Sequence, residues 1–306
     1  MELIFAKIGD PHLGREFKTG IPFERRGEYE ARQWSTFLEK LGEPCDVNVN
    51  MGDLFDRPLV SYMIVLRAIE AYKTEAEANP DRLYIILAGN HDRSRQPGVV
   101  GAFDLMEAAL KSIDNIVVVT TPTVIERALY LPWEWARTAA EQMVDVVEEI
   151  DIAFCHHDLE SFGGDDSHML PAKAIQALGA KEIFCGHWHL SGDYEVDGVG
   201  VVCTGSLLPF SHAEDPDGEI YQTLTTAELA ELDPEDIRNK FIRVLLEPGE
   251  DPPAVDCLSL TTKRSKSTAS DETLTMEGFD WPAVLKHHLD GVPDDVRTFI
   301  NDRLSI

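Results

Sequence analysis

The sequence predicts a layered α/β domain, followed by a smaller β-rich region and a helical tail. Short apolar runs of strand length alternate with amphipathic segments of helical spacing through most of the chain. Hydrophobic residues make up 43% of the 306 residues, which is enough for a large buried core. The composition changes after about residue 220, and this change places the end of the first domain there.

The first half of this domain is expected to alternate between strands and helices. Strands are predicted at 2–8, 47–51 and 83–87, and helices at 24–41, about 62–78 and about 103–110. The second strand shows its pattern most clearly. Val47, Val49 and Met51 alternate there with Asn48 and Asn50, as expected for a strand with one apolar face.

The second half is predicted to be richer in strands. The expected elements are a β-rich segment at 116–131, a helix at 134–150, a strand at 152–155, a short helix from Pro171, a strand at 182–185, and a hairpin that turns at Asp197-Gly198 into a strand at 199–204. These complete a domain of residues 1–220.

Beyond residue 220, strands at 241–246 and 255–260 predict a small capping region at 221–262, and a polar linker follows at 263–275. A tail at 276–306 is expected to hold two short helices. Its apolar stripe, formed by Val296, Phe299, Ile300 and Leu304, cannot be buried by two such short helices alone.

The composition argues against several classes of protein. A net charge of −28 argues against a protein that coats nucleic acid by bulk attraction, so any contact with DNA must be local. No apolar run approaches the ~18 residues that span a bilayer, and the first residues lack secretory features, so we expect a soluble, cytoplasmic protein. The five cysteines form no C-x-x-C pair and are expected to be reduced thiols.

Polar side chains follow most of the predicted strands at the point where each strand ends. They are Asp10, His12, Asp53, Asn90, His91, His156, His187 and His189. Loops at the carboxyl edge of a sheet hold their side chains over a common crevice. Carboxylate, amide and imidazole groups without thiolate suit hard and borderline divalent cations. Pairs at i and i+2 can converge on one cation or straddle two ions ~3.5 to 4 Å apart, and the spacing does not decide which.

The order of these motifs resembles that of the calcineurin-like metallophosphoesterases. The chain reads D-x-H, G-D-L-F-D, G-N-H-D, H-x-D and G-H-x-H in succession, within about residues 1–219. The opening G-D-P-H-L-G, the second motif and the downstream G-S-L-L-P-F-S are more similar to the SbcD-type nuclease subunit of bacterial and phage SbcCD DNA-repair complexes. The resemblance implies a layered β-sandwich flanked by helices, with two divalent ions, Mn²⁺ or alternatively Mg²⁺.

The resemblance also implies how the ligands are divided between two metal ions. Asp10, His12 and His189 would hold one ion, and Asn90, His156 and His187 would hold the other. Asp53 would bridge the pair, since one shared carboxylate screens the repulsion between two cations. Ions held in this way activate water for in-line attack at phosphorus.

The resemblance further implies roles close to the leaving group. His91 would act there as general acid or charge stabiliser, with Asp92 orienting it. Asp56 stands where some family members have His, so a second catalytic histidine is not expected. In the fourth motif we expect His156 rather than His157 to be the ligand, because it is the first residue beyond its strand.

Basic residues cluster beside the motifs. They are Arg15 after the first motif, Arg57 after the second, and Arg93 and Arg95 after the third. In so acidic a chain they suggest a positive rim for a phosphate backbone, although pairing with nearby acidic residues is the alternative. Trp133 and Trp135 are expected to be packing residues rather than a platform for bases.

Together these expectations describe a metal-dependent DNA nuclease that acts in repair, recombination or replication. The resemblance implies DNA as substrate, an SbcC-like ATPase with a long coiled coil as partner, and a nuclease homodimer. The apolar stripe of the tail is the candidate contact for the ATPase. A phosphatase or cyclic-nucleotide phosphodiesterase with the same metals is the alternative enzyme. A DNA-end-binding scaffold with vestigial activity is an alternative from another class, and the complete ligand set speaks against it.

Overall fold

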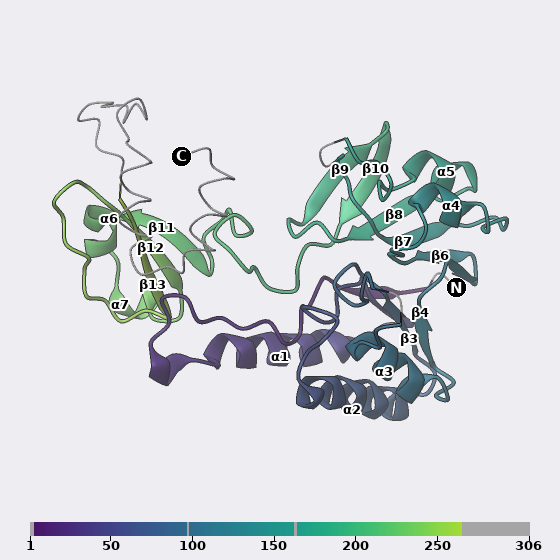
Figure 1. Cartoon of the computed structure of the whole chain (residues 1–306), viewed down its shortest axis with the longest axis horizontal. Helices are drawn as coiled ribbons and strands as arrows, with labels where there is room; N and C mark the ends of the chain where they lie inside the picture. The colour runs from purple at the N-terminus through teal and green to yellow at the C-terminus, as the bar shows by residue number, and fades with distance from the viewer. Residues whose placement is uncertain (1–2, 97, 162–163, 265–306) are drawn as a thin grey trace, which may run out of the picture. The chain divides into compact units, whose positions relative to one another are not determined.

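Two β-sheets lie face to face, and helices cover their outer sides (Figure 1). The computed structural model describes residues 3–96, 98–161 and 164–264. One compact unit, Met1–Leu246 with Asp251–Lys263, contains both sheets. The predicted α/β fold with layered sheets and flanking helices is therefore confirmed.

The first sheet consists of four parallel strands in the order β1-β2-β3-β4. Its strands are β1 (Phe5–Ile8), β2 (Val47–Asn50), β3 (Leu83–Leu87) and β4 (Ile116–Val119), and its helices are η1 (Phe23–Arg25), α1 (Glu28–Leu41), α2 (Tyr62–Ala78) and α3 (Ala102–Leu110). Phe37, Tyr72 and Phe103 are fully buried where α1, α2 and α3 pack on the sheet. Because neighbouring strands run in the same direction, their carboxyl ends lie side by side.

Strand β2 is buried on both faces. Val47 and Val49 face the second sheet, as the alternation predicts. Asn48 and Asn50 are buried as well. The Asn48 amide donates to the carbonyls of Lys40 and Leu41 in the last turn of α1. The polar face of the strand thus caps a helix.

The second sheet has six strands in the order β5-β6-β7-β8-β10-β9. Its elements are β5 (Thr123–Ile125), β6 (Ala128–Leu131), α4 (Ala139–Met143), β7 (Ile152–His156), α5 (Ala172–Ala177), β8 (Glu182–Gly186), β9 (Gly192–Val196) and β10 (Val199–Cys203). The strands β6, β7, β8 and β10 are parallel, and antiparallel β5 and β9 form the edges. The hairpin turn at Asp197-Gly198 is confirmed, with positive φ angles at both residues.

The helix predicted at 134–150 is wrong in extent, because only Ala139–Met143 is helical. Thr138 and Glu141 form a capping box that starts the helix. Val144 and Val147 are 76% and 80% exposed, so these two residues contribute no burial that would stabilise a longer helix. Their β-branched side chains also disfavour the helical conformation.

Aromatic side chains fill the space between the two main sheets. The Phe154 ring stacks on Tyr130 with ring centroids 5.4 Å apart and on Phe184 at 5.6 Å, and it meets Phe5 at 5.0 Å. Phe5, Phe154 and Phe184 lie on strands that lead into motif residues, and Tyr130 lies on β6, which pairs with β7. Close packing here therefore fixes the separation of the strand ends.

A third sheet, β11-β12-β13, forms the capping region. Its elements are β11 (Tyr221–Thr225), α6 (Thr226–Ala230), α7 (Pro234–Ile237), β12 (Phe241–Leu246) and β13 (Ser259–Arg264). The strand at 241–246 was predicted and β11 was missed. The strand predicted at 255–260 lies at Ser259–Arg264 instead, because Cys257 and Leu258 are buried without pairing to β12. These consecutive buried apolar residues imitate a strand.

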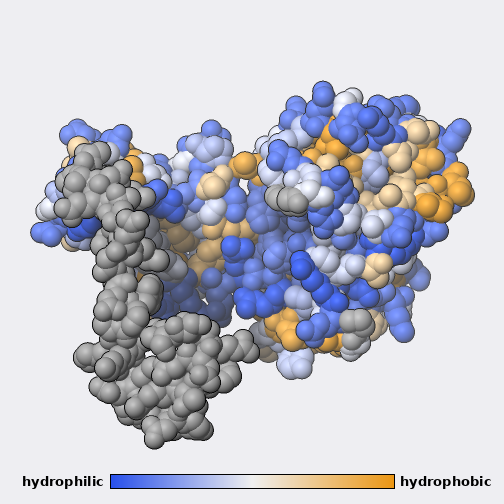
Figure 2. Space-filling model, turned by 45° about the horizontal axis from the view of Figure 1, so that its top comes forward, coloured by the Kyte–Doolittle hydropathy of each residue, from blue (hydrophilic) through white to orange (hydrophobic). Residues whose placement is uncertain are grey.

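The surface formed by the described residues is mostly hydrophilic, with smaller apolar patches (Figure 2). Within the described ranges, no helix is long and apolar enough to cross a bilayer. The linker beyond Arg264 and the predicted helical tail with its apolar stripe lie outside these ranges.

Candidate metal centre

The polar residues at the strand ends come together at one edge of the two main sheets. Three of them, His12, Asp53 and His187, have positive φ angles of 46°, 47° and 73°. Non-glycine residues adopt this conformation at an energetic cost, so the surrounding structure must hold them there. Such strain is found where side chains are aimed at a functional site.

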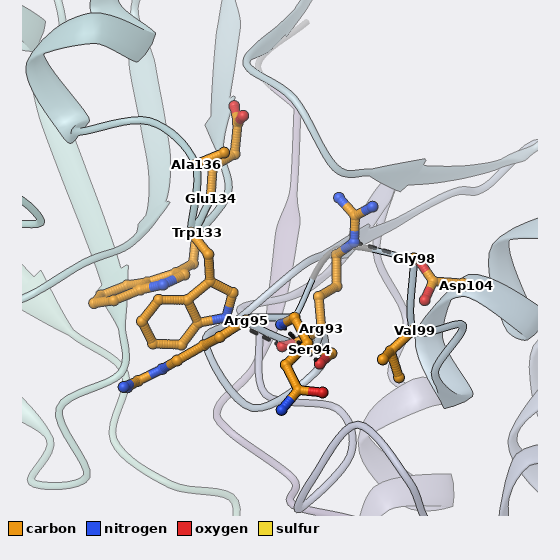
Figure 3. A pocket seen from close by; sticks show the side chains of 11 residues that line it. Arg93, Ser94, Arg95, Gly98, Val99, Asp104, Trp133, Glu134 and Ala136 are labelled. Atoms are coloured by element: carbon orange, nitrogen blue, oxygen red, sulfur yellow. Dashed lines mark hydrogen bonds and ion pairs between the residues drawn. The ribbon is translucent and has the colours of Figure 1, made fainter.

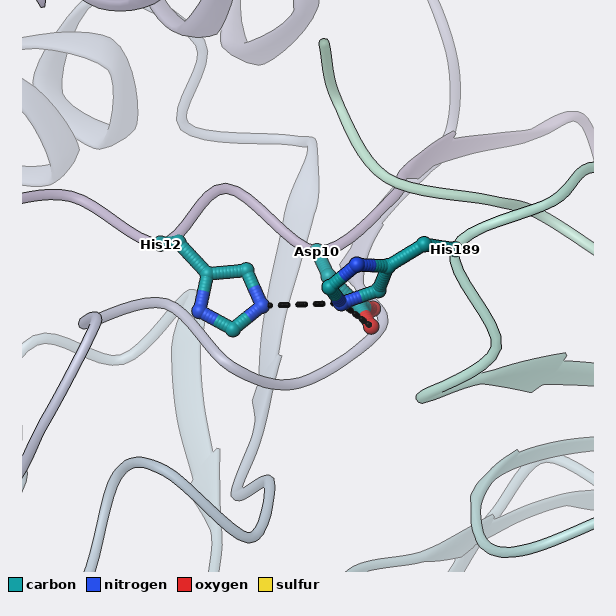
Figure 4. Close-up of side chains that lie close together, drawn as sticks. All are labelled: Asp10, His12 and His189. Carbon is teal, nitrogen blue, oxygen red and sulfur yellow. Dashed lines mark hydrogen bonds and ion pairs between the residues drawn. The ribbon is translucent and has the colours of Figure 1, made fainter. Parts of the chain in front are cut away.

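The first group consists of Asp10, His12 and His189 (Figure 4). The Nε2 atoms of His12 and His189 lie 3.1 Å apart. The Oδ2 atom of Asp10 lies 3.9 Å from His189 Nε2. Asp10 and His12 are fully buried, whereas His189 is partly exposed. The group can therefore hold a cation that remains open to solvent on one side.

The second group consists of Asp53, His156 and His187, with Asn90 beside it. Asn90 Oδ1 lies 3.0 Å from His156 Nε2 and 2.9 Å from His187 Nδ1. With the amide flipped, its nitrogen would instead donate to these atoms and to Asp53. With the oxygen inward, oxygen and nitrogen lone pairs converge on one point, as around a divalent ion.

Asp53 lies between the two groups. Its Oδ2 atom is 3.6 Å from His12 Nε2 in the first group and 3.4 Å from His156 Nε2 in the second. Its Oδ1 atom accepts the backbone N–H of His91 at 2.8 Å. One carboxylate oxygen thus faces both groups, which is the geometry that a bridging ligand requires.

The far nitrogen of three imidazole rings is held by the protein. His156 Nδ1 lies 2.8 Å from the carbonyl oxygen of Met51, and His187 Nε2 lies 2.7 Å from Asp158 Oδ1. His189 Nδ1 lies 3.4 Å from Glu214 Oε2. A proton on each of these nitrogens leaves the opposite nitrogen free to bind a metal, and the contact fixes the ring orientation.

Burial sets the electrostatics of the centre. It raises the pKa of Asp10 to about 7 and lowers the pKa of His12 and of His187, which favours the neutral imidazole that binds metals. Burial also disfavours charge on Asp53 and His156. Their mutual attraction outweighs it, lowering the pKa of Asp53 and raising that of His156 to about 9. A divalent cation would supply the positive charge in place of the His156 proton.

The unpaired buried oxygen of Asp10 supports a metal ion at the first ligand group. Asp10 Oδ1 and His12 Nδ1 are buried and have no hydrogen-bond partner in the described part of the chain. Unpaired buried polar atoms are costly, and a cation beside Asp10 would satisfy the oxygen. The donors are carboxylate, amide and imidazole, a set that suits Mn²⁺, Mg²⁺ or Zn²⁺.

The family comparison agrees with this geometry. The family model named calcineurin-like phosphoesterase matches residues 5–191, more than half of the chain. The chain belongs to this family. No curated protein matches the chain significantly. Among solved structures, phosphopantetheinyl hydrolase from Mycobacterium tuberculosis is similar over 70% of this chain and 92% of its own, with 14% sequence identity and a TM-score of 0.38.

The structure of this calcineurin-like phosphoesterase corrects the role expected for Asp92. The Asp92 carboxylate accepts backbone N–H groups from Leu54, Phe55 and Gly89, so it ties together the loops that carry the second and third motifs. The His91 ring is oriented instead by the carbonyl oxygen of Asp56, 2.7 Å from Nδ1. Asp92 supports the site without orienting His91.

His91 borders the metal centre. One of its ring nitrogens lies within 4.8 Å of ligand atoms of His12 and Asp53. With Nδ1 held by Asp56, Nε2 is the nitrogen left for a substrate or an ion.

The two histidines of the fourth motif point to different surroundings. His156 faces Asn90 and Asp53. His157 is buried beside Trp133, and neither of its ring nitrogens has a partner in the described residues. The structure thus groups His156, and not His157, with the other ligands.

The four arginines expected to line a positive rim differ in their surroundings. Arg15 and Arg57 lie 3.6 and 3.0 Å from Asp56, and Arg93 lies 3.3 Å from Asp104. These three therefore pair with acidic residues, which was the alternative considered. Arg95 instead lies over the ring of Trp135.

Sequence reasoning missed Asp158 and Glu214 as residues that orient ligands. Asp158 was available as the third residue of H-H-D, two positions after a ligand. Glu214 lies 25 residues beyond His189 in the chain, so no local spacing signalled it. Glu214 is itself held by the backbone N–H of Phe210 and the Ser211 hydroxyl.

We expect Asp158→Asn and Glu214→Gln each to weaken Mn²⁺ binding about 10- to 100-fold, because the imidazole loses the partner that fixes its ring and raises its basicity. Titration calorimetry on chelator-treated protein measures this. Glu182→Gln, at the exposed opposite end of β8, is the matched control and should bind normally. Unchanged affinity in both variants would contradict the orienting role.

Proposed function

We propose that this metal-dependent phosphoesterase is a DNA nuclease that uses two divalent ions, with Mn²⁺ as the preferred ion. The single observation that carries the two-ion centre is the position of Asp53, whose Oδ2 faces both ligand groups. Ions held by the two ligand groups would supply Lewis acidity toward water and toward the phosphoryl oxygens.

The side chains of the chain have separate tasks in this reaction. Asp53 and the six other proposed ligands fix the positions at which charge can be stabilised. Asp158 and Glu214 keep His187 and His189 in a single orientation. His91, with Nδ1 held by the Asp56 carbonyl, presents Nε2 to the leaving-group oxygen, where a proton neutralises the developing alkoxide.

A cationic pocket supports a polyanionic substrate. A cavity of about 270 Å³ is lined by Arg15, Lys18 and Arg243. Arg15 lies 3.6 Å from Asp56 and Lys18 pairs with Glu16, so Arg243 is the lining cation without a carboxylate partner among the described residues. Phe210 lines the same cavity, and its ring lies 5.1 Å from that of His12. In a chain with a net charge of −28, such a pocket next to the centre favours a phosphate backbone.

The motifs add a further reason to favour DNA. The segment G-S-L-L-P-F-S, which resembles the SbcD-type nucleases, leads from the metal centre into the capping sheet. Its Leu208 and Phe210 pack against Tyr221 and Phe241 of that sheet. The residues that carry the resemblance thus join the centre to the cationic pocket.

A phosphatase or cyclic-nucleotide phosphodiesterase is the second candidate enzyme. The metal centre serves these reactions equally well, because the ions act on the phosphoryl group whatever its substituents. A DNA-end-binding scaffold is the third candidate, and the complete ligand set argues against it.

We expect the protein with Mn²⁺ to cleave end-labelled duplex DNA, and Asp53→Asn to lower the rate about a thousandfold or more, because an electrostatic contribution of several kcal/mol is lost. A small chromogenic phosphodiester is assayed in parallel. Cleavage of the small ester alone would contradict the nuclease and favour the second candidate. DNA binding without any hydrolysis would favour the scaffold, and DNA cleavage that survives Asp53→Asn would overturn the mechanism.

His91→Gln should slow DNA cleavage about 10²- to 10⁴-fold, because the alkoxide leaving group needs a proton. Hydrolysis of bis(p-nitrophenyl) phosphate should fall less than about tenfold, since p-nitrophenolate leaves without protonation. Comparing kcat for the two substrates measures this difference. An equal loss on both would show that His91 acts through the metals or the fold.

We further propose a homodimer and an SbcC-like ATPase as partners, from the motif resemblance. Exposed apolar residues at the start of α2, Leu59, Tyr62 and Met63, offer a surface for a second copy. We expect the ATPase to co-purify with the full chain and not with a chain ending at Ser270. Equal recovery with both chains would exclude the tail as its contact, and light scattering gives the oligomeric state.

A further inference from the structure

A second pocket adjoins the second ligand group through Trp133, whereas Phe210 adjoins the first. It has a volume of about 420 Å³ and is lined by Arg93, Ser94 and Arg95 from the loop after the third motif, and by Trp133, Glu134 and Trp135 from the segment after β6. Figure 3 shows Arg93 directed toward Asp104 at one side of this pocket, and Trp133 with Arg95 at the other. Neither the metal ligands nor the proposed mechanism uses these side chains.

The pocket has a flat cation on its wall. The Arg95 guanidinium lies 3.9 Å from the centre of the Trp135 ring. The Trp135 ring is fixed in turn, because its Nε1–H donates to the carbonyl of Arg93 at 3.1 Å. Arg95 is exposed while Trp135 is half-buried, so the guanidinium forms the outer layer of the stack. A third flat group can be added to such a stack.

The charge of Arg95 is available to a ligand. Arg93 pairs with Asp104 at 3.3 Å, and Arg137 pairs with Glu134 at 3.6 Å, so these nearby cations already face carboxylates. Arg95 has no carboxylate within ion-pair distance among the described residues. Its interaction is with the indole face, which leaves its outer face open.

Trp133 connects the pocket to the metal ligands. Its ring is stacked on His168, with centroids 4.2 Å apart and planes 9° apart. On another side it lies 5.2 Å from the ring of His187, one of the proposed ligands. Trp133 is almost completely buried, so it is a rigid wall shared by the pocket and the centre. A substrate group that occupies the pocket would therefore lie close to the phosphate at the metal centre.

We propose that this pocket binds a nucleobase of the substrate strand next to the scissile phosphate, stacked on the Arg95–Trp135 pair. The inference deepens the proposed nuclease function and rests on it. A base is flat and has a polar edge, and stacking on aromatic or guanidinium planes is how proteins hold unpaired bases without reading their sequence. Ser94, which lines the pocket, offers a hydroxyl group to that edge. The preferred substrate is thus a strand whose base is free to leave a duplex.

Trp133 and Trp135 pack against each other as expected, with ring centroids 5.2 Å apart, but they differ in burial. Trp133 is enclosed, whereas Trp135 is half-buried and covered by the flexible side chain of Arg95. A phosphate bound by Arg95 alone would need no indole behind the guanidinium. Binding of a base should therefore depend on Trp135, whereas binding of a phosphate alone should not.

The test compares two single-stranded oligonucleotides of equal length and charge, oligo(dT) and its abasic tetrahydrofuran analogue. Binding to the full-length protein is followed by fluorescence anisotropy in the presence of a chelator, which prevents hydrolysis. We expect Trp135→Ala to weaken oligo(dT) binding about 5- to 150-fold, from the ~1 to 3 kcal/mol of one base stack, and to change abasic binding less than twofold. Trp135→Phe should restore most of the loss on oligo(dT).

Arginine variants separate stacking from charge. Arg95→Lys keeps the charge and loses the flat guanidinium, so it should weaken oligo(dT) binding and leave abasic binding unchanged. Arg127→Gln is the matched control, because Arg127 pairs with Asp151 at the far side of the second sheet. It should change neither.

Three outcomes would overturn the inference. The first is that Trp135→Ala weakens binding of both oligonucleotides equally. The second is that it weakens binding of neither. The third is that Arg95→Gln weakens oligo(dT) binding while Arg95→Lys binds oligo(dT) as tightly as the unaltered protein. Cleavage is scored separately, with Mn²⁺ added. If no DNA is cleaved but binding of oligo(dT) depends on Trp135 as expected, the nuclease proposal fails and the base pocket stands.

Discussion

The structure depends on one buried carboxylate, that of Asp53, placed where two groups of ligands meet. A buried carboxylate requires positive charge nearby. The loops around Asp53 also pack so closely that no additional side-chain atom fits beside it. A Cβ atom on Gly89 would lie 2.2 Å from Asp53 Oδ1, and one on Gly52 would lie 2.1 Å from His156 Nδ1. Gly52 also has a φ of 112°, which other residues rarely adopt. The glycines of G-D-L-F-D and G-N-H-D are thus required by the close approach of the loops that surround this carboxylate.

The surroundings of the centre differ in chemistry on its two sides. Toward Phe210, the segment after β1 contributes Arg15 and Lys18, and strand β12 of the capping sheet contributes Arg243, whose side chains suit phosphate groups. Toward Trp133, the loops after β3 and β6 contribute flat side chains that suit a base. A substrate with alternating phosphates and bases would use both sides at once, whereas a small phosphomonoester would use neither. This asymmetry is the reason that we propose a polynucleotide as the substrate of this calcineurin-like phosphoesterase.

The sequence was sufficient for the elements whose local pattern agrees with their packing. The strands at Leu83–Leu87 and Phe241–Leu246 were predicted at their observed bounds, because burial and pairing coincide there. It failed where the two diverge. Cys257 and Leu258 are buried without pairing, and Val144 and Val147 are apolar without being buried. Burial and backbone pairing are separate constraints, and a hydrophobicity pattern reports only the first.

By itself, the sequence determined which residue types stand at the strand ends and in which order, because strand period, turn glycines and motif spacing are local properties. The tertiary structure decided what each of them faces. In the folded protein, Asp53 lies between the two ligand groups and Glu214 contacts His189. Asp92 accepts backbone N–H groups, and Arg95 stacks on Trp135. Contacts between residues far apart in the chain arise only when the sheets and loops pack. Asp53 could be read from the sequence as a ligand, but its place between two ions is a property of the fold.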